Sequence, residues 1–145
     1  MPLKLSLKPG EKFVINGAVV ANGDRRTTIV VQNKASILRD KDILQTEDVD
    51  TPAKRIYFPV MMMYLDGAGR AEHYQNFALR MTEFMSAISS GEGLALCMAI
   101  SKDVMTGEHY KALIKCRKLI EYERERLSYV PGGVSEDAKD DRKTA

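Results

Sequence analysis

The chain has 145 residues, of which 44% are hydrophobic and 29% are charged, and its formal net charge is +2. This is the composition of a soluble globular protein with one domain, or with two small modules that share a core. The longest apolar stretch near the middle, residues 56–65, is too short to span a bilayer, and the first residues lack the apolar core of a signal peptide. We therefore expect a cytoplasmic protein with no membrane partner.

The charges are unevenly distributed along the chain. Residues 1–44 carry eight basic and four acidic side chains, whereas the remainder is net negative. A basic segment joined to an acidic one is a weak indication of a polyanionic partner. The alternative interpretation is the ordinary solvated face of a sheet.

The same basic segment predicts five short strands. Leu3, Leu5 and Leu7 alternate with polar residues, which is the period of a half-buried strand. Asn16-Gly17 is a strong signal for a two-residue hairpin, because both residues tolerate a positive φ. The strands are predicted at 3–7, 12–15, 18–21, 26–32 and 36–38. We expect one small sheet with little interior of its own, which must pack on the rest of the chain or on a second copy in a homodimer.

Helical patterns dominate the rest of the chain. Residues 40–44 either begin a short helix or continue a strand, and Thr51-Pro52 is suited to cap and open a helix. Helices are predicted at 56–65 with Pro59 near the first turn, at 70–89, at 94–105 and at 109–129. The second of these is the strongest, since its apolar residues form one stripe at spacings of three and four.

The fold class predicted from these elements is α+β. An antiparallel β-module of about five short strands occupies residues 1–45, and three to four α-helices at 46–130 pack on it. Residues 131–145 are highly charged, contain no aromatic residue and are predicted to be a disordered tail.

The sequence contains no catalytic or metal-binding constellation. His73 and His109 are the only histidines, and no HExxH, GxSxG or Walker-type motif occurs. The glycine-rich stretch 66–69 lacks a lysine at the spacing of a phosphate-binding loop, so we interpret it as a turn between helices. We expect a protein that is not an enzyme and needs no cofactor or metal ion.

The sulfur-containing residues are interpreted as structural. Cys97 and Cys116 lie in apolar helical surroundings and are expected to be buried free thiols rather than a disulfide. The three consecutive methionines at 61–63 are expected to fill the core rather than to form an adaptable binding surface.

Basic side chains of the strand region are the candidate binding residues. Alternation places Lys4 and Lys8 on one face, and Arg39 follows an apolar pair at a strand end. A guanidinium there could donate two hydrogen bonds to a phosphate or to a base edge, and single-stranded RNA presents both. The predicted RNA-binding residues are Lys4, Lys8, Arg25, Arg26 and Arg39. We expect the first four to contact phosphates and Arg39 to read bases.

Two stretches of this segment resemble the carbon storage regulator CsrA family. They are Gly10-Glu11, within the pattern Leu-x-Leu-x-x-Lys-x-Gly-Glu-x-Phe-x-Ile, and residues 38–43, which read Leu-Arg-Asp-Lys-Asp-Ile. Members of that family are small translational repressors that bind GGA-containing mRNA leaders as intertwined β-dimers. The resemblance implies a CsrA-like β-module in which Arg39 matches a binding arginine. The two adjacent arginines that precede the Gly-Glu pair in that family are replaced here by Leu7 and Lys8.

Over roughly residues 1–130 the chain resembles the flagellum biosynthesis repressor FlbT family. The matching stretches are 1–13, 32–39, 52–58 and 63–66. The resemblance implies a cytoplasmic post-transcriptional regulator of α-proteobacteria. Such a protein would bind the 5′ untranslated region of flagellin mRNA and repress its translation or promote its degradation until the flagellar hook is complete.

A second function remains open from the residues. The amphipathic stripes at 74–88 and 113–127 could form a groove for a protein partner, such as flagellin, a chaperone-like protein or another flagellar regulatory protein. The chain would then be an adaptor in flagellar assembly, and its effect on mRNA would be indirect.

Overall fold

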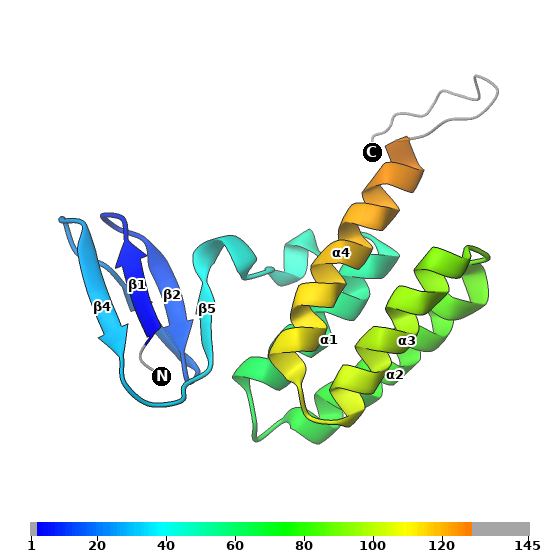
Figure 1. The fold of residues 1–145 in the computed structure, drawn as a ribbon, viewed down its shortest axis with the longest axis horizontal. Helices are drawn as coiled ribbons and strands as arrows, with labels where there is room; N and C mark the ends of the chain where they lie inside the picture. The colour runs from blue at the N-terminus through cyan, green and yellow to red at the C-terminus, as the bar shows by residue number, and fades with distance from the viewer. Residues whose placement is uncertain (1–2, 129–145) are drawn as a thin grey trace.

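In a computed structural model of the chain, which describes residues 3–128, the strands lie on one side and the helices on the other (Figure 1). The predicted fold class, α+β with strands followed by helices, is confirmed. No helix within these residues is long and apolar enough to cross a membrane.

Strands β1 (Leu3–Leu7) and β4 (Thr27–Val31) form an antiparallel ribbon in which every residue of one strand is paired with a residue of the other. The predicted alternation is present, since Leu5 and Leu7 are buried while Lys4 is exposed. One face of the ribbon therefore contributes apolar side chains to the interior, and the opposite face is available to solvent.

A second antiparallel sheet contains β2 (Lys12–Ile15), β3 (Ala18–Ala21) and β5 (Ile37–Arg39), with β2 in the middle. The predicted hairpin joins β2 to β3, and Asn16 and Gly17 adopt φ values of 49° and 85°. These are the left-handed conformations that a tight two-residue turn requires.

The prediction of a single five-stranded sheet is wrong, because the strands form one two-stranded and one three-stranded sheet. The reason lies in the edges of β2, which pairs along one side with β3 and along the other with β5. No edge of β2 is left for β1, the strand that immediately precedes it in the sequence, and β1 pairs with β4 instead.

Two short 3-10 helices lead from the strands to the helical part. They are η1 (Asp40–Asp42) and η2 (Thr46–Asp48). Residues 40–44, for which the sequence left a helix and a strand open, thus begin as a 3-10 turn.

Helix α1 (Pro52–Leu65) begins at the predicted signal. The hydroxyl of Thr51 accepts a hydrogen bond from the backbone N–H of Lys54 at 3.3 Å, and a proline occupies the first turn. Because the helix starts before residue 56, Pro59 lies in its interior, and the expectation that Pro59 stands near the first turn is wrong. This proline has no N–H to donate to the carbonyl of Arg55, a loss that the surrounding core tolerates.

Helices α2 (Arg70–Ala87), α3 (Gly91–Met105) and α4 (His109–Ser128) complete an up-and-down bundle (Figure 1). Their ends lie close to the predicted ones. Helix α3 begins earlier than residue 94 because the hydroxyl of Ser90 accepts the N–H of Gly93 at 3.3 Å and caps the helix. Helix α1 packs against α2 and α4, and α4 against α3, whereas α2 and α3 have few contacts.

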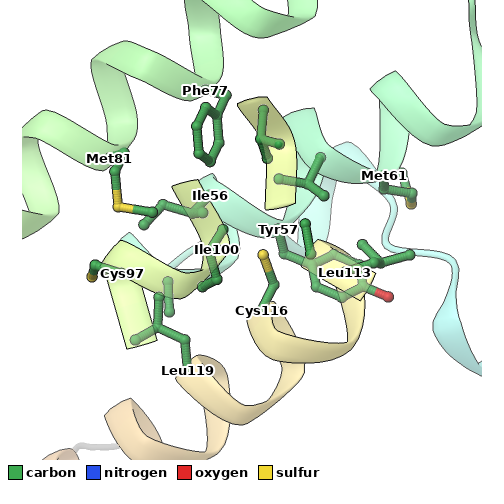
Figure 2. Packing of buried hydrophobic residues seen from close by; sticks show 14 of the residues in the cluster. Ile56, Tyr57, Met61, Phe77, Met81, Cys97, Ile100, Leu113, Cys116 and Leu119 are labelled. Carbon is green, nitrogen blue, oxygen red and sulfur yellow. The ribbon is translucent and has the colours of Figure 1, made fainter. Parts of the chain in front are cut away.

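All four helices contribute to one continuous apolar core (Figure 2). Its fully buried side chains include Ile56 on α1, Ile100 on α3 and Leu113 on α4. Helix α2 adds Phe77 and Met81 from its predicted stripe. The periodic patterns therefore identify the buried faces of these helices.

The expectations for the sulfur-containing residues are confirmed. Met61 and Met63 are buried in the helical core, and Cys97 and Cys116 are buried free thiols. Burial raises the pKa of Cys97 to about 11 and also raises the pKa of Cys116. Both thiols therefore stay protonated near neutral pH, which makes them poor nucleophiles.

The two parts of the molecule meet where β5 and η1 pass α1. Leu38 on β5 belongs to the helical core. The hydroxyl of Tyr64 donates to the carbonyl of Ile37 at 3.0 Å and accepts its N–H at 2.8 Å. The hydroxyl of Tyr57 donates to the carbonyl of Asp42 at 2.6 Å. The helices thus fix the position of β5 through both apolar packing and hydrogen bonds.

The division into units at 1–45 and 46–130 stays a prediction, and so does the homodimer. The tail at 131–145 lies outside the described residues.

Candidate nucleic-acid interface

Two turns of the β-region (residues 3–44) lie side by side at one end of the β1–β4 ribbon. They are residues 8–11 and 22–26, and the side chain of Asn22 joins them. Its amide Nδ2 donates to the carbonyl of Lys8 at 2.8 Å and to the carbonyl of Arg25 at 2.9 Å. One short amide therefore holds two basic residues of different turns at a fixed separation.

Backbone hydrogen bonds hold the same two turns together. The N–H of Gly10 donates to the carbonyl of Gly23 at 2.9 Å, and the N–H of Asn22 donates to the carbonyl of Glu11 at 2.8 Å. Gly10 has a φ of 72°, a conformation that other residues rarely adopt. The backbone beneath the basic side chains is thus well determined.

We call the side chains of Lys8, Arg25 and Arg26 the basic corner. All three residues are exposed. Within residues 3–128, none of these side chains forms a hydrogen bond or a close ion pair. Their charges are therefore available to an external anion.

Arg39 borders the basic corner but is engaged with the protein. Its Nε donates to Glu11 Oε2 at 3.0 Å, and its Nη2 lies 2.9 Å from Oε1 and 2.8 Å from Oε2. The same Nη2 donates to the carbonyl of Ser6 at 2.6 Å. This pairing leaves Nη1 as the part of the guanidinium that has no hydrogen-bond partner within the described chain.

The Glu11 carboxylate is held in its charged form. Its pKa lies below the ordinary value of 4.5, first because the backbone N–H of Lys8 donates to Oε1 at 2.9 Å, and second because of the hydrogen bonds from Arg39. Arg39 forms the ion pair with this carboxylate, and the charge of Lys8 also lowers its pKa, by a smaller amount.

Lys4 stands apart from the other candidates. It lies on the exposed face of β1, opposite Val30, and four residues before Lys8, or about 13 Å along an extended strand. Of the five predicted binding residues, the fold thus gathers Lys8, Arg25, Arg26 and Arg39 at one end of the ribbon and leaves Lys4 farther along it.

This arrangement suits an extended polyanion better than a small ligand. Lysine and arginine side chains that reach into solvent can neutralise successive phosphates of a nucleic-acid strand. A guanidinium group can also bind one phosphate with two hydrogen bonds. The residues that organise the surface, Asn22 and Glu11, were not among the predicted binding residues. The only signal in the sequence for Asn22 is its place in an Asn-Gly-Asp turn.

The glycine-rich stretch at 66–69 is a connection between α1 and α2, as predicted. Asp66 Oδ1 accepts the N–H of Gly69 at 3.2 Å, and Oδ2 lies 3.1 Å from His73 Nε2. These contacts lower the pKa of Asp66, with the His73 hydrogen bond as the largest cause. No group of three or more potential metal ligands is found within residues 3–128.

Comparison with known proteins gives a consistent result. The family model for the flagellar protein FlbT matches residues 3–127. A probable flagellum biosynthesis repressor protein FlbT of Caulobacter sp. (strain K31) is 65% identical over 130 residues, which cover 90% of this chain and 99% of the relative. No solved structure matches.

Two further relatives carry related names. The flagellum biosynthesis repressor protein FlbT of Caulobacter vibrioides (strain ATCC 19089 / CIP 103742 / CB 15) is 64% identical over 135 residues, covering 93% of this chain and 96% of that protein. A probable flagellum biosynthesis repressor protein FlbT of Rhodopseudomonas palustris (strain TIE-1) is 43% identical over 129 residues, covering 88% of this chain and 99% of the relative.

Proposed function

The chain belongs to the FlbT family of flagellar proteins, and from this premise we propose that it regulates flagellum biosynthesis by binding RNA. Its target is the 5′ untranslated region of flagellin mRNA, where binding represses translation and promotes degradation. The names of the relatives support a repressor of flagellum biosynthesis. The RNA step is our own inference.

The observation that supports RNA binding is the basic corner. Three exposed cations, Lys8, Arg25 and Arg26, stand on two turns that the Asn22 side chain joins by hydrogen bonds. None of the three side chains forms a hydrogen bond or a close ion pair within the described residues, although Lys8 lies near the Glu11 carboxylate. Phosphate contacts made by such side chains supply most of the affinity for a nucleic acid. Lys4 extends the same positive surface along β1.

Arg39 has a different part in this proposal. Its ion pair keeps Glu11 from repelling phosphates, and its Nη1 remains able to contact RNA at the edge of the basic corner. The protein performs no chemistry on the RNA. A leader held on this surface is blocked to ribosomes, and decay follows by cellular nucleases.

A salt titration with purified full-length protein and a flagellin leader transcript tests the proposal. The logarithm of affinity should fall linearly with the logarithm of salt concentration, by about 0.7 per phosphate contact for a single strand. The double variant Arg25→Ala/Arg26→Ala should bind more weakly and should reduce that slope by about 1.4.

The matched control removes the same charge from the helices. Lys102 on α3 and Lys111 on α4 are exposed, and their side chains form no hydrogen bond or ion pair within residues 3–128. Lys102→Ala/Lys111→Ala should leave the salt slope nearly unchanged. A leader that does not bind the wild-type protein, or a slope that drops equally in both double variants, would overturn the proposal.

A further inference from the structure

At one end of the bundle, α1 and α3 begin and α2 and α4 end (Figure 1). The side chains at this end enclose a groove. Its volume is about 390 Å³, which falls in the range of ordinary ligand sites. Side chains from the first turn of α1, the last turns of α2 and α4 and the loop before α3 line it. We call it the end groove.

The floor of the end groove is apolar and already formed. Phe84 and Tyr122 are 9% and 8% exposed, and Ile88 lies beside them. Gly93 packs directly beneath: a Cβ at this position would lie 2.1 Å from Ile88 Cδ1 and 3.1 Å from Tyr122 Cε2. Because Gly93 has no side chain, Ile88 and Tyr122 can pack against the first turn of α3.

The two carboxylates on the rim of the end groove already have partners within the protein. Glu83 pairs with Arg80 at 3.1 Å, and Glu123 Oε2 accepts the backbone N–H of Ala53 at 3.0 Å, where it caps α1. Both anions thus have partners inside the protein.

Two guanidinium groups on the same rim lack a carboxylate partner. Arg126 lies over the ring of Tyr122, 4.9 Å from its centre, and Arg55 is exposed. Neither forms an ion pair within the described part of the chain. The end groove thus combines an apolar floor with unmatched positive charge.

We infer that the end groove binds an acidic, amphipathic peptide segment of a partner protein, with an apolar side chain on the floor and carboxylates on Arg55 and Arg126. Tyrosine and arginine beside an apolar pocket are typical anchors of protein interfaces. The apolar floor favours an apolar side chain of a peptide over the continuous phosphate backbone of an RNA. This surface lies on the helices and does not depend on the basic corner.

Selection from a displayed library of short random peptides on the immobilised full-length protein tests the inference. The enriched peptides should pair leucine or phenylalanine with neighbouring aspartate or glutamate. Arg55→Glu/Arg126→Glu should weaken a selected peptide by about tenfold or more. Lys102→Glu/Lys111→Glu, which changes the charge equally elsewhere, should leave its affinity unchanged.

A second variant tests the shape of the floor without changing its charge. Gly93→Ala forces Ile88 to move, so it should weaken the same peptide by about tenfold while the urea midpoint stays close to wild type. If the urea midpoint of Gly93→Ala falls strongly, the test uses Ile88→Ala instead. This variant shortens a side chain of the floor directly. Equal binding to wild type and to both kinds of variant would overturn the inference.

Two other results would also overturn it. Residues 129–145 lie outside the described residues and include Glu136, Asp137, Asp140 and Asp141. If peptides bind only after these four are changed to their amides, the end groove is occupied by the chain itself. If Arg55→Glu/Arg126→Glu abolishes leader RNA binding while the peptide affinity is unchanged, the end groove is an RNA site.

Discussion

The β-region and the helical bundle (residues 52–128) use their basic side chains in different ways. In the described β-region, only Arg39 forms an ion pair. The helices pair many of theirs with carboxylates: Lys54, Arg80, Lys115, Arg117 and Arg124. Seven basic residues without an ion pair thus lie within residues 3–44, against six in the longer stretch 52–128. This higher density is why we propose the polyanion site for the β-region.

The two regions also differ in how they bury apolar surface. The bundle has a continuous core to which all four helices contribute, whereas the buried residues of the strands, other than Leu38, lie outside that cluster. Small sheets of this size need external packing. We conclude that the bundle supplies most of the stability, whereas the β-region carries the proposed binding surface.

The largest expected effect tests that conclusion directly. Leu113 is fully buried in the bundle, so Leu113→Ala should lower the free energy of unfolding by about 2–5 kcal/mol. Arg25→Ala, on the exposed turn of the β-region, should change it by less than about 0.5 kcal/mol. Urea denaturation followed by circular dichroism measures both. Similar losses of unfolding free energy in the two variants would contradict the conclusion that the bundle supplies most of the stability.

A smaller effect is expected at the junction between the regions. Tyr64→Phe removes a hydroxyl that bonds both the N–H and the carbonyl of Ile37, so it should cost about 1–3 kcal/mol of unfolding free energy. The control is Tyr74→Phe, since the hydroxyl of Tyr74 is exposed and contacts only the sulfur of Met105. If the two variants unfold at the same urea concentration, the hydroxyl of Tyr64 does not couple the regions.

Two roles of Arg39 can be separated by mutation: a direct contact with RNA and neutralisation of the Glu11 carboxylate. Arg39→Ala should weaken leader RNA binding by about tenfold, because it exposes the charge of Glu11 and removes a cation. Adding Glu11→Gln removes the exposed charge. If Arg39 acts by neutralising Glu11, the double variant should recover most of the affinity in a filter-binding assay. No recovery would assign Arg39 a direct contact.

The smallest expected effect concerns acid stability. The pKa of Glu11 is lower in the folded protein than its ordinary 4.5, so its contribution is present above that pH and is lost as the pH falls through the folded value. Wild type should lose more stability than Glu11→Gln as the pH falls below 4.5. Asp24→Asn, an exposed neighbour with no partner within residues 3–128, should follow the wild-type profile.

Much of the secondary structure could be predicted from local sequence. The alternation in β1, the Asn16-Gly17 hairpin and the start of α1 at Thr51-Pro52 are all confirmed. These features depend on residues a few positions apart, whose period and capping chemistry are visible in the chain itself.

The arrangement of these elements could not be predicted in the same way. Two sheets form instead of one because β2 pairs with β3 along one edge and with β5 along the other. Local strand propensity does not reveal which strands pair with each other. Pro59 lies inside α1 because the core around it outweighs the local cost of a proline.

The sequence by itself determined the basic character of the first region and the apolar faces of the helices, since both follow from residue type and spacing. Only the tertiary structure decided which cations are free. Arg39 meets Glu11 across 28 positions, and Glu123 reaches the start of α1 across 70. Such partners are chosen by how the chain folds back on itself, so the available charge at the basic corner and the end groove emerges only from the folded protein.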